Sequence, residues 1–140
     1  MYMTDKWEGK EHFNIKRFKY IEFYVGNAKQ VVHFYRSAFG FTPYAYCGPE
    51  TGVYSHVSYV LKSRKIFFVF TTPLKSYHPA SDWLKKHGDG VRDVAFDVED
   101  VNFVYDSCIE RGAIPNVKPH SNKDEGLFCS ASIKTYGDTI

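Results

Sequence analysis

The sequence predicts an α+β protein made of two similar β-α-β-β-β units in tandem. The stretch Gly88–Ala113 has the pattern of a strand, a helix N-cap and an amphipathic helix in direct succession. The stretch Phe18–Phe41 repeats this order, with Tyr20 at the position of Asp93, a shift of 73 residues. A repeated supersecondary pattern of this kind indicates a duplicated structural unit.

The first unit opens with a predicted strand at 18–25, where apolar residues alternate with polar ones. Asn27 is a good N-cap because its side chain can accept from open N–H groups of the first helical turn. The spacing of apolar residues predicts a helix over 28–39, and Gly40 ends it. Three further strands are predicted, at 41–47, 55–62 and 65–72, the last two joined as a hairpin at Ser63-Arg64.

A linker and a short helix follow at 75–87, with Ser81 expected as the N-cap. The second unit then has a strand at 91–98, Asp100 as N-cap, a helix at 101–111 and strands at 114–119 and 127–134. A polar loop separates these last strands at 120–126, and a turn is expected at 136–139. By comparison with the first unit, one strand is still missing, so the second unit is expected to be truncated before its last strand.

The expected organisation is therefore a polar leader over 1–15 and a single domain over 16–140. That domain consists of unit 16–74 and unit 88–140, joined by the linker and short helix 75–87.

Composition excludes several classes of protein. The 140 residues carry a formal net charge of +2 with mixed charges and no concentrated basic patch, so no nucleic-acid partner is expected. No apolar run reaches membrane length, and the N-terminal residues lack the apolar core of a secretory signal. Three cysteines without metal-type spacing make a disulfide framework improbable, so we expect a cytoplasmic protein with no membrane contact.

Three segments carry a resemblance to a known family: FYVGNAKQVVHFYRSAFGF, HGDGVRDVAFDVEDV and TYGDT. Together with the tandem units, they resemble the vicinal oxygen chelate (glyoxalase and bleomycin resistance) superfamily. Within this superfamily, the sequence is similar to the N-terminal domain of the 4-hydroxyphenylpyruvate dioxygenase family. The similarity covers nearly the whole chain, from Ile15 to Ile140.

The resemblance implies an oxidoreductase of tyrosine and phenylalanine catabolism. Such an enzyme uses Fe(II) to convert 4-hydroxyphenylpyruvate and O₂ to homogentisate and CO₂. Two His and one Glu hold the iron, and in the family these ligands lie in a second domain, beyond Ile140. The resemblance therefore implies no catalytic, cofactor-binding or metal-binding residue in this chain, which alone is expected to be inactive.

Weak candidate metal ligands occur near the strand positions that face the cavity in the superfamily. Asp93 occupies one of these positions, Glu22 lies nearby in the pattern, and His56 lies on another predicted strand. The simpler interpretation makes Asp93 an inner-face carboxylate held by tyrosine hydroxyls or by the surroundings of Arg92. Glu22 is expected to be solvated or paired with Lys or Arg. A single histidine on a strand, such as His56, is most often a hydrogen-bonded structural residue.

Three functions stay open. The chain can be the non-catalytic N-terminal domain of the dioxygenase, or that of the related 4-hydroxymandelate synthase. It can also be a free-standing member of the superfamily, either a small enzyme with a metal site across a dimer or a metal-free protein that binds a small ligand among Tyr20, Tyr24 and Tyr59. The expected partners are the enzyme's own C-terminal catalytic domain, further copies in a homo-oligomer and, through the whole enzyme, a 2-oxo acid substrate.

Overall fold

A computed structural model describes residues 13–122 and 128–140 of the chain. Its elements follow the two predicted units and the connecting helix. The first unit contains β1 (Ile15–Tyr24), α1 (Ala28–Phe39), β2 (Thr42–Cys47), β3 (His56–Ser63) and β4 (Ile66–Pro73). The rest comprises α2 (Pro79–His87), β5 (Gly90–Val98), α3 (Val101–Glu110), β6 (Ile114–Asn122) and β7 (Phe128–Lys134).

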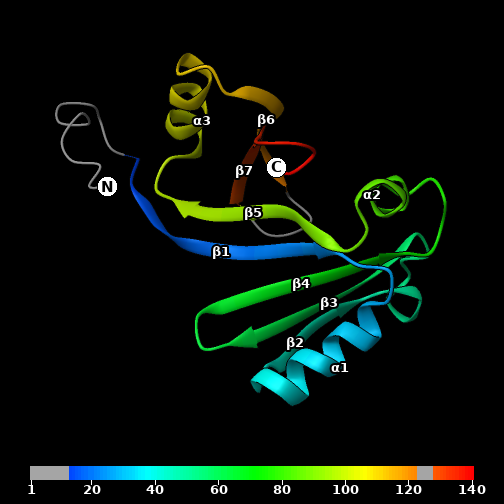
Figure 1. Ribbon diagram of the computed structural model, residues 1–140. Helices are drawn as coiled ribbons and strands as arrows, with labels where there is room; N and C mark the ends of the chain where they lie inside the picture. The colour runs from blue at the N-terminus through cyan, green and yellow to red at the C-terminus, as the bar shows by residue number, and fades with distance from the viewer. Residues whose placement is uncertain (1–12, 123–127) are drawn as a thin grey trace, which may run out of the picture.

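Five strands form one sheet in the order β2-β3-β4-β1-β5, and β6 pairs with β7 in a separate two-stranded sheet. β1 runs parallel to β4 and antiparallel to β5, so β1 and β5 join the two units. In Figure 1, α1 and α2 lie on opposite sides of the five-stranded sheet, and α3 lies near β6 and β7. The predicted α+β architecture is confirmed.

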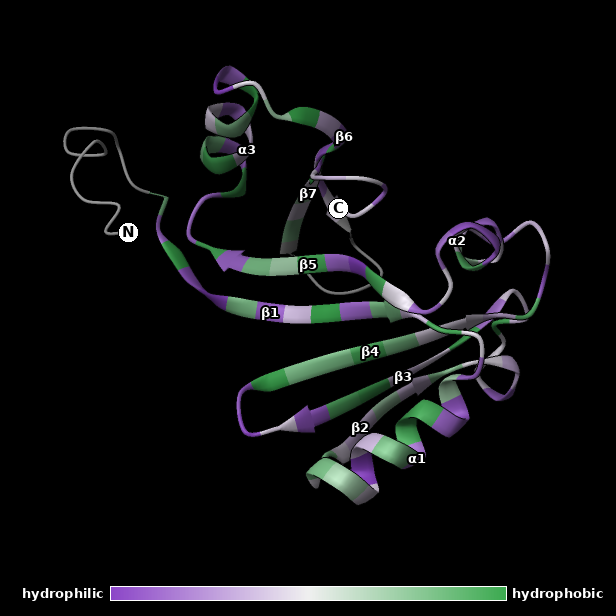
Figure 2. Cartoon of the chain, in the orientation of Figure 1, coloured by the Kyte–Doolittle hydropathy of each residue, from purple (hydrophilic) through white to green (hydrophobic). Residues whose placement is uncertain are grey.

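The core of the first unit lies between α1 and the sheet. Its buried residues are Val25, Ala28, Val32, Leu61 and Phe70. Aromatic rings extend it: Phe23 stacks on Phe70 with ring centroids 5.1 Å apart, and Tyr35 of α1 contacts the same ring at 5.0 Å. Figure 2 shows hydrophobic colour along much of β4, which agrees with the apolar run predicted there.

The predicted caps of the two long helices are confirmed. Asn27 accepts a hydrogen bond from the Gln30 amide at 3.1 Å, and Asp100 accepts one from the Phe103 amide at 3.0 Å. Each side chain satisfies an N–H group that has no partner within its helix. At the other end of α1, Gly40 has φ +70°, a left-handed conformation that costs glycine little.

Several element boundaries differ from the prediction. The N-cap of α2 is His78, not Ser81, because Pro79 fits the first helical turn and the His78 side chain accepts from the Ala80 amide at 3.2 Å. β1 begins at Ile15 rather than at residue 18, because β5 pairs with it from that residue. β6 continues to Asn122, because β7 provides backbone partners for residues that were predicted to be loop.

The chain's last residue lies beside β5. The Ile140 amide donates to the Arg92 carbonyl oxygen at 2.9 Å, and the Ile140 carbonyl accepts from the Val94 amide at 3.0 Å. This pattern is that of a parallel ladder, the relationship that β4 has to β1 in the first unit. These two bonds hold Ile140 beside β5.

Candidate functional site

The candidate site is the face of the five-stranded sheet that points away from α1, here called the inner face. Strand residues alternate between faces, and Phe23 of β1, like Val25 just after the strand, packs toward α1. Their neighbours therefore point the other way. The inner face carries Tyr20, Glu22 and Tyr24 of β1, Ser58 of β3, Thr71 of β4 and Asp93 of β5.

Glu22 is half-buried and held by hydroxyl groups. The Thr71 hydroxyl donates to Glu22 Oε1 at 2.7 Å, and the Ser58 hydroxyl lies 2.7 Å from that of Thr71. Burial raises the pKa of Glu22, the Thr71 hydrogen bond opposes this rise, and the nearby Asp93 charge adds to it. The expectation that Glu22 is solvated or paired with Lys or Arg is wrong, because β4 places Thr71 beside it.

Asp93 lies directly opposite Glu22 in the antiparallel pairing of β1 and β5. The Tyr20 hydroxyl donates to Asp93 Oδ2 at 3.0 Å, which agrees with the predicted tyrosine support. Burial raises the pKa of Asp93, while the Tyr20 hydrogen bond and the Arg92 charge act against the rise. The two half-buried carboxylates thus share one patch, each with its own hydroxyl donor.

His56 has a different environment. Its Nδ1 lies 2.9 Å from the Ser55 hydroxyl, and its ring contacts that of His78 with centroids 4.7 Å apart. The pKa of His78 is lowered by burial and by the neighbouring His56. Tyr59, predicted to line an inner cavity, packs against the α1 core instead, because it pairs with Phe70 and shares its face.

The donor chemistry of the inner face does not fit the iron site of two His and one carboxylate. Oxygen atoms predominate, and both carboxylates already accept from protein hydroxyls. Across residues 13–122 and 128–140, no group of three or more His, Cys, Asp and Glu side chains is placed to hold a metal ion. We therefore derive no chemical step through iron at this face.

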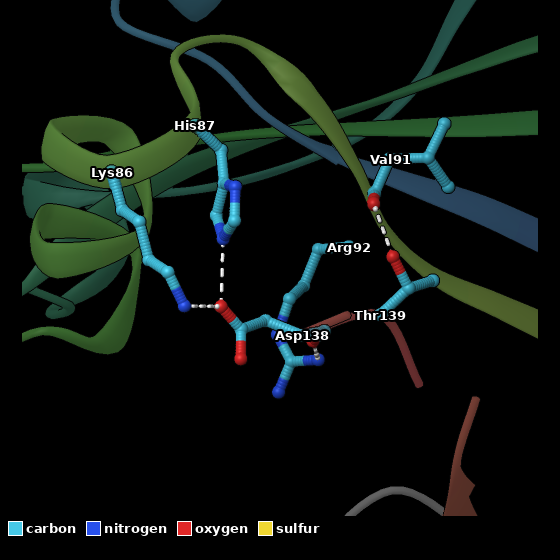
Figure 3. A network of polar contacts seen from close by, with 6 residues as sticks. All are labelled: Lys86, His87, Val91, Arg92, Asp138 and Thr139. Carbon is cyan, nitrogen blue, oxygen red and sulfur yellow. Dashed lines mark hydrogen bonds and ion pairs between the residues drawn. The ribbon is translucent and has the colours of Figure 1, made fainter. Parts of the chain in front are cut away.

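A second polar cluster joins α2, β5 and the C-terminal turn (Figure 3). Asp138 Oδ2 accepts from Lys86 Nζ at 2.6 Å and lies 2.7 Å from His87 Nε2. Arg92 donates to the Asp138 carbonyl, and the Thr139 hydroxyl donates to the Val91 carbonyl at 3.2 Å. The hydrogen bonds from Lys86 and His87 lower the pKa of Asp138 to about 2.

The three segments that carry the family resemblance meet in space near this cluster. The first and second segments meet where the Gly26 amide donates to Asp89 Oδ1 at 2.8 Å. The second and third meet at His87 and Asp138. The segments are far apart in the chain, but they form one junction at the ends of β1 and α2 and beside β5.

Sequence reasoning missed Thr71, Ser58 and the Asp138 cluster. A threonine that directly follows the apolar run at 66–70 was a usable signal, because alternation places it on the face away from α1. The contact between His87 and Asp138 had no local signal, because 51 residues separate its partners.

Comparison with known proteins assigns the chain to a family. The model of the Glyoxalase/Bleomycin resistance protein/Dioxygenase superfamily matches residues 17–131. The chain belongs to this superfamily. It is 44% identical, over 97% of its length, to the N-terminal part of 4-hydroxyphenylpyruvate dioxygenases from Xenopus tropicalis and Danio rerio. It spans about a third of the length of these relatives, 35% in each case.

Solved structures of the superfamily agree with the fold. A variant of 4-hydroxymandelate synthase from Streptomyces coelicolor matches with a TM-score of 0.82 and 29% identity, over 90% of this chain and 37% of that one. Methylmalonyl-CoA epimerase from Mycobacterium tuberculosis matches with a TM-score of 0.65 and 12% identity, over 82% of this chain and 77% of that one. The epimerase shows likeness of fold alone.

None of the helices in the described part of the chain is long and apolar enough to cross a membrane.

Proposed function

We propose that this chain is the non-catalytic N-terminal domain of a 4-hydroxyphenylpyruvate dioxygenase. The observation that carries the proposal is the 44% identity over 97% of the chain, confined to about a third of the relatives' length. The remaining two-thirds of such an enzyme would supply the catalytic domain and its Fe(II), which would bind O₂ and the 2-oxo acid. Cytoplasmic tyrosine and phenylalanine catabolism would be its setting.

The inner face supports a structural role for this domain. Hydroxyl donors occupy Glu22 and Asp93, and His56 contacts another imidazole rather than either carboxylate. These residues hold two half-buried carboxylates in place instead of presenting an open ligand set. In this proposal the sheet serves as a rigid platform against the catalytic domain.

The N-terminal domain of a 4-hydroxymandelate synthase is the second candidate. The synthase variant gives a TM-score of 0.82 over 90% of the chain. The two enzymes differ in their product, which the catalytic domain would decide. A metal-free protein that binds a small ligand is a weaker candidate. Tyr59 lies on the α1 face, so only Tyr20 and Tyr24 of the predicted cavity lining remain on the inner face.

The first experiment compares the 140-residue chain with the longer protein that this proposal expects its gene to encode. Both are loaded with Fe(II), analysed for bound iron and supplied with 4-hydroxyphenylpyruvate in an oxygen electrode. We expect the chain alone to retain no stoichiometric iron and to take up no oxygen, and the longer protein to do both. Chromatography of the product then separates homogentisate from 4-hydroxymandelate.

Turnover by the chain alone would overturn the proposal. Asp93, Glu22 and His56 would then be the first residues to mutate. If the gene encodes nothing beyond Ile140, the free-standing binding protein becomes the better candidate.

We also propose that the chain self-associates. Ile140 pairs with β5 only at Arg92 and Val94, and the outer edge of β5 has no other strand beside it in the described structure. Open strand edges promote pairing between molecules. Sedimentation velocity over a wide concentration range should show dimers or larger species, whereas a monomer at every concentration would contradict this.

A further inference from the structure

A hollow opens where α2, β5, the β6–β7 sheet and the C-terminal turn meet. Its volume is about 400 Å³, and its wall includes Trp83, Lys86, Arg92, Asn116, Lys134 and Asp138. Sites for small molecules have volumes in this range. The hollow lies next to the cluster drawn in Figure 3, and no step of the proposed function uses it.

The charges around the hollow are mixed, with three cationic side chains and two carboxylates. Lys86, Arg92 and Lys134 line it, against the carboxylates Asp82 and Asp138. Asp82 already pairs with a cation outside the wall, Lys85, at 3.0 Å.

The cations of the wall are only partly neutralised. The Asp138 carboxylate forms an ion pair with Lys86 and also contacts His87, which lies outside the wall. Arg92 donates to the main-chain carbonyl of Asp138 rather than to its carboxylate. Lys134 has no ion-pair partner within the described residues. Lys134 is thus available to an incoming anion. Arg92 lies over the rings of Tyr24 and Trp83, and no carboxylate among the described residues forms an ion pair with it.

The wall also contains a hydrogen-bond donor without an acceptor. The indole nitrogen of Trp83 is buried and has no partner in the part of the chain that the structure describes. Buried donors are usually satisfied, so this nitrogen is unusual. Because the atom itself is buried, a ligand in the hollow does not reach it, and the site depends on the charged side chains of the wall.

We propose that this hollow binds a small oxyanion, the phosphate or carboxylate group of a small molecule, through Lys86, Arg92 and Lys134. Guanidinium and ammonium groups bind such oxyanions by charge-assisted hydrogen bonds. The bound group competes with the Asp138 carboxylate for Lys86. Pro79, Trp83 and Ile140 form the apolar part of the wall.

Tryptophan fluorescence tests the proposal. The chain has two tryptophans, so Trp7→Phe leaves Trp83 as the only reporter. Inorganic phosphate, phenyl phosphate and benzoate are titrated at constant ionic strength, with chloride as the balancing anion. We expect saturable changes with at least one of the three. Tight phosphate binding identifies a phosphate ligand, whereas preference for benzoate identifies a carboxylate on an aromatic body.

Two charge-matched variants decide whether the hollow is responsible. In the Trp7→Phe background, Lys134→Gln should weaken binding by about threefold to tenfold, because one charged contact is lost. Lys118→Gln removes the same charge from an exposed position of β6 outside the hollow and should leave affinity unchanged. Absence of any saturable signal, or equal weakening by both variants, would overturn the proposal.

Discussion

The Tyr20 hydroxyl donates to the Asp93 carboxylate at 3.0 Å, and the two residues occupy equivalent positions of the two repeated units, 73 residues apart. Equivalent residues touch because β1 and β5, the first strands of the two units, are antiparallel neighbours. At the junction between the two units, the first strand of one unit therefore pairs with the first strand of the other.

This contact predicts a stability effect for Tyr20→Phe. The change removes the hydroxyl and leaves Asp93 half-buried without that donor, which should lower the free energy of unfolding by about 1 to 2 kcal/mol. Urea denaturation at pH 7 measures it. Tyr54→Phe, at an exposed tyrosine (66% accessible), is the control and should unfold like the unaltered chain. Equal stability of both variants would mean that the hydrogen bond contributes nothing.

The burial of Glu22 predicts that the free energy of unfolding depends on pH. Because burial raises its pKa above 4.5, the folded chain holds this proton at pH values where the unfolded chain has released it. Its contribution to stability is therefore complete below pH 4.5 and is lost as pH rises through the folded value. Glu22→Gln keeps an acceptor for Thr71 but cannot ionise, so its stability relative to the unaltered chain should increase from pH 4.5 to pH 7.

Unfolding free energies at several pH values test this trend. The matched control is Glu110→Gln, at an exposed position at the end of α3. It should leave the pH profile unchanged. A Glu22→Gln profile parallel to that of the unaltered chain would contradict the predicted role of burial.

Asp138→Asn should loosen the C-terminal turn. The variant loses the ion pair with Lys86 and changes the contact with His87, and these two contacts hold this turn beside α2 and β5. Amide hydrogen exchange at Ile140 and Val94, whose amides form the ladder with β5, should become faster. The pKa of Asp138 is about 2, below its ordinary 3.8. The stabilisation by the charged Asp138 carboxylate is therefore complete above pH 3.8 and is lost as pH falls through about 2.

Exchange rates elsewhere show whether this effect is local. The amide of Val32 in α1 should keep its rate in Asp138→Asn. Asp106→Asn, at an exposed position of α3, should alter neither region. Unchanged exchange at Ile140 in Asp138→Asn would show that the ion pairs do not hold the turn.

His78→Ala should destabilise α2. His78 caps this helix, and loss of a side-chain cap typically costs about 0.5 to 2 kcal/mol. His78→Asn supplies another capping acceptor and should recover most of the loss, while His33→Ala, at an exposed position of α1, should have little effect. If His78→Asn were as unstable as His78→Ala, packing against His56 and Tyr24 would matter more than the cap.

The cap should also respond to pH. The pKa of His78 lies below its ordinary 6.5, so the folded state favours the neutral ring. Its contribution is present above pH 6.5 and is lost as pH falls through the lowered folded value. Thermal unfolding at pH 5 and pH 7 should show a smaller difference in His78→Ala than in the unaltered chain.

The sequence alone determined the repeated units, because apolar periodicity and capping residues are local properties. Asn27 and Asp100 mark the starts of α1 and α3, and each bonds within its own first turn. His78 was missed because a histidine is not an expected cap, and its role depends on the ring orientation that packing against His56 sets.

Tertiary structure decided the surroundings of the polar residues. Glu22 is buried and bonded to Thr71 because β4 lies beside β1, a pairing between residues 49 positions apart. Lys86, His87 and Asp138 meet because the C-terminal turn folds back onto α2. Local patterns carry no information about which distant segment will desolvate or neutralise a charge. The site's residues were therefore visible in the sequence, while their partners and pKa shifts were not.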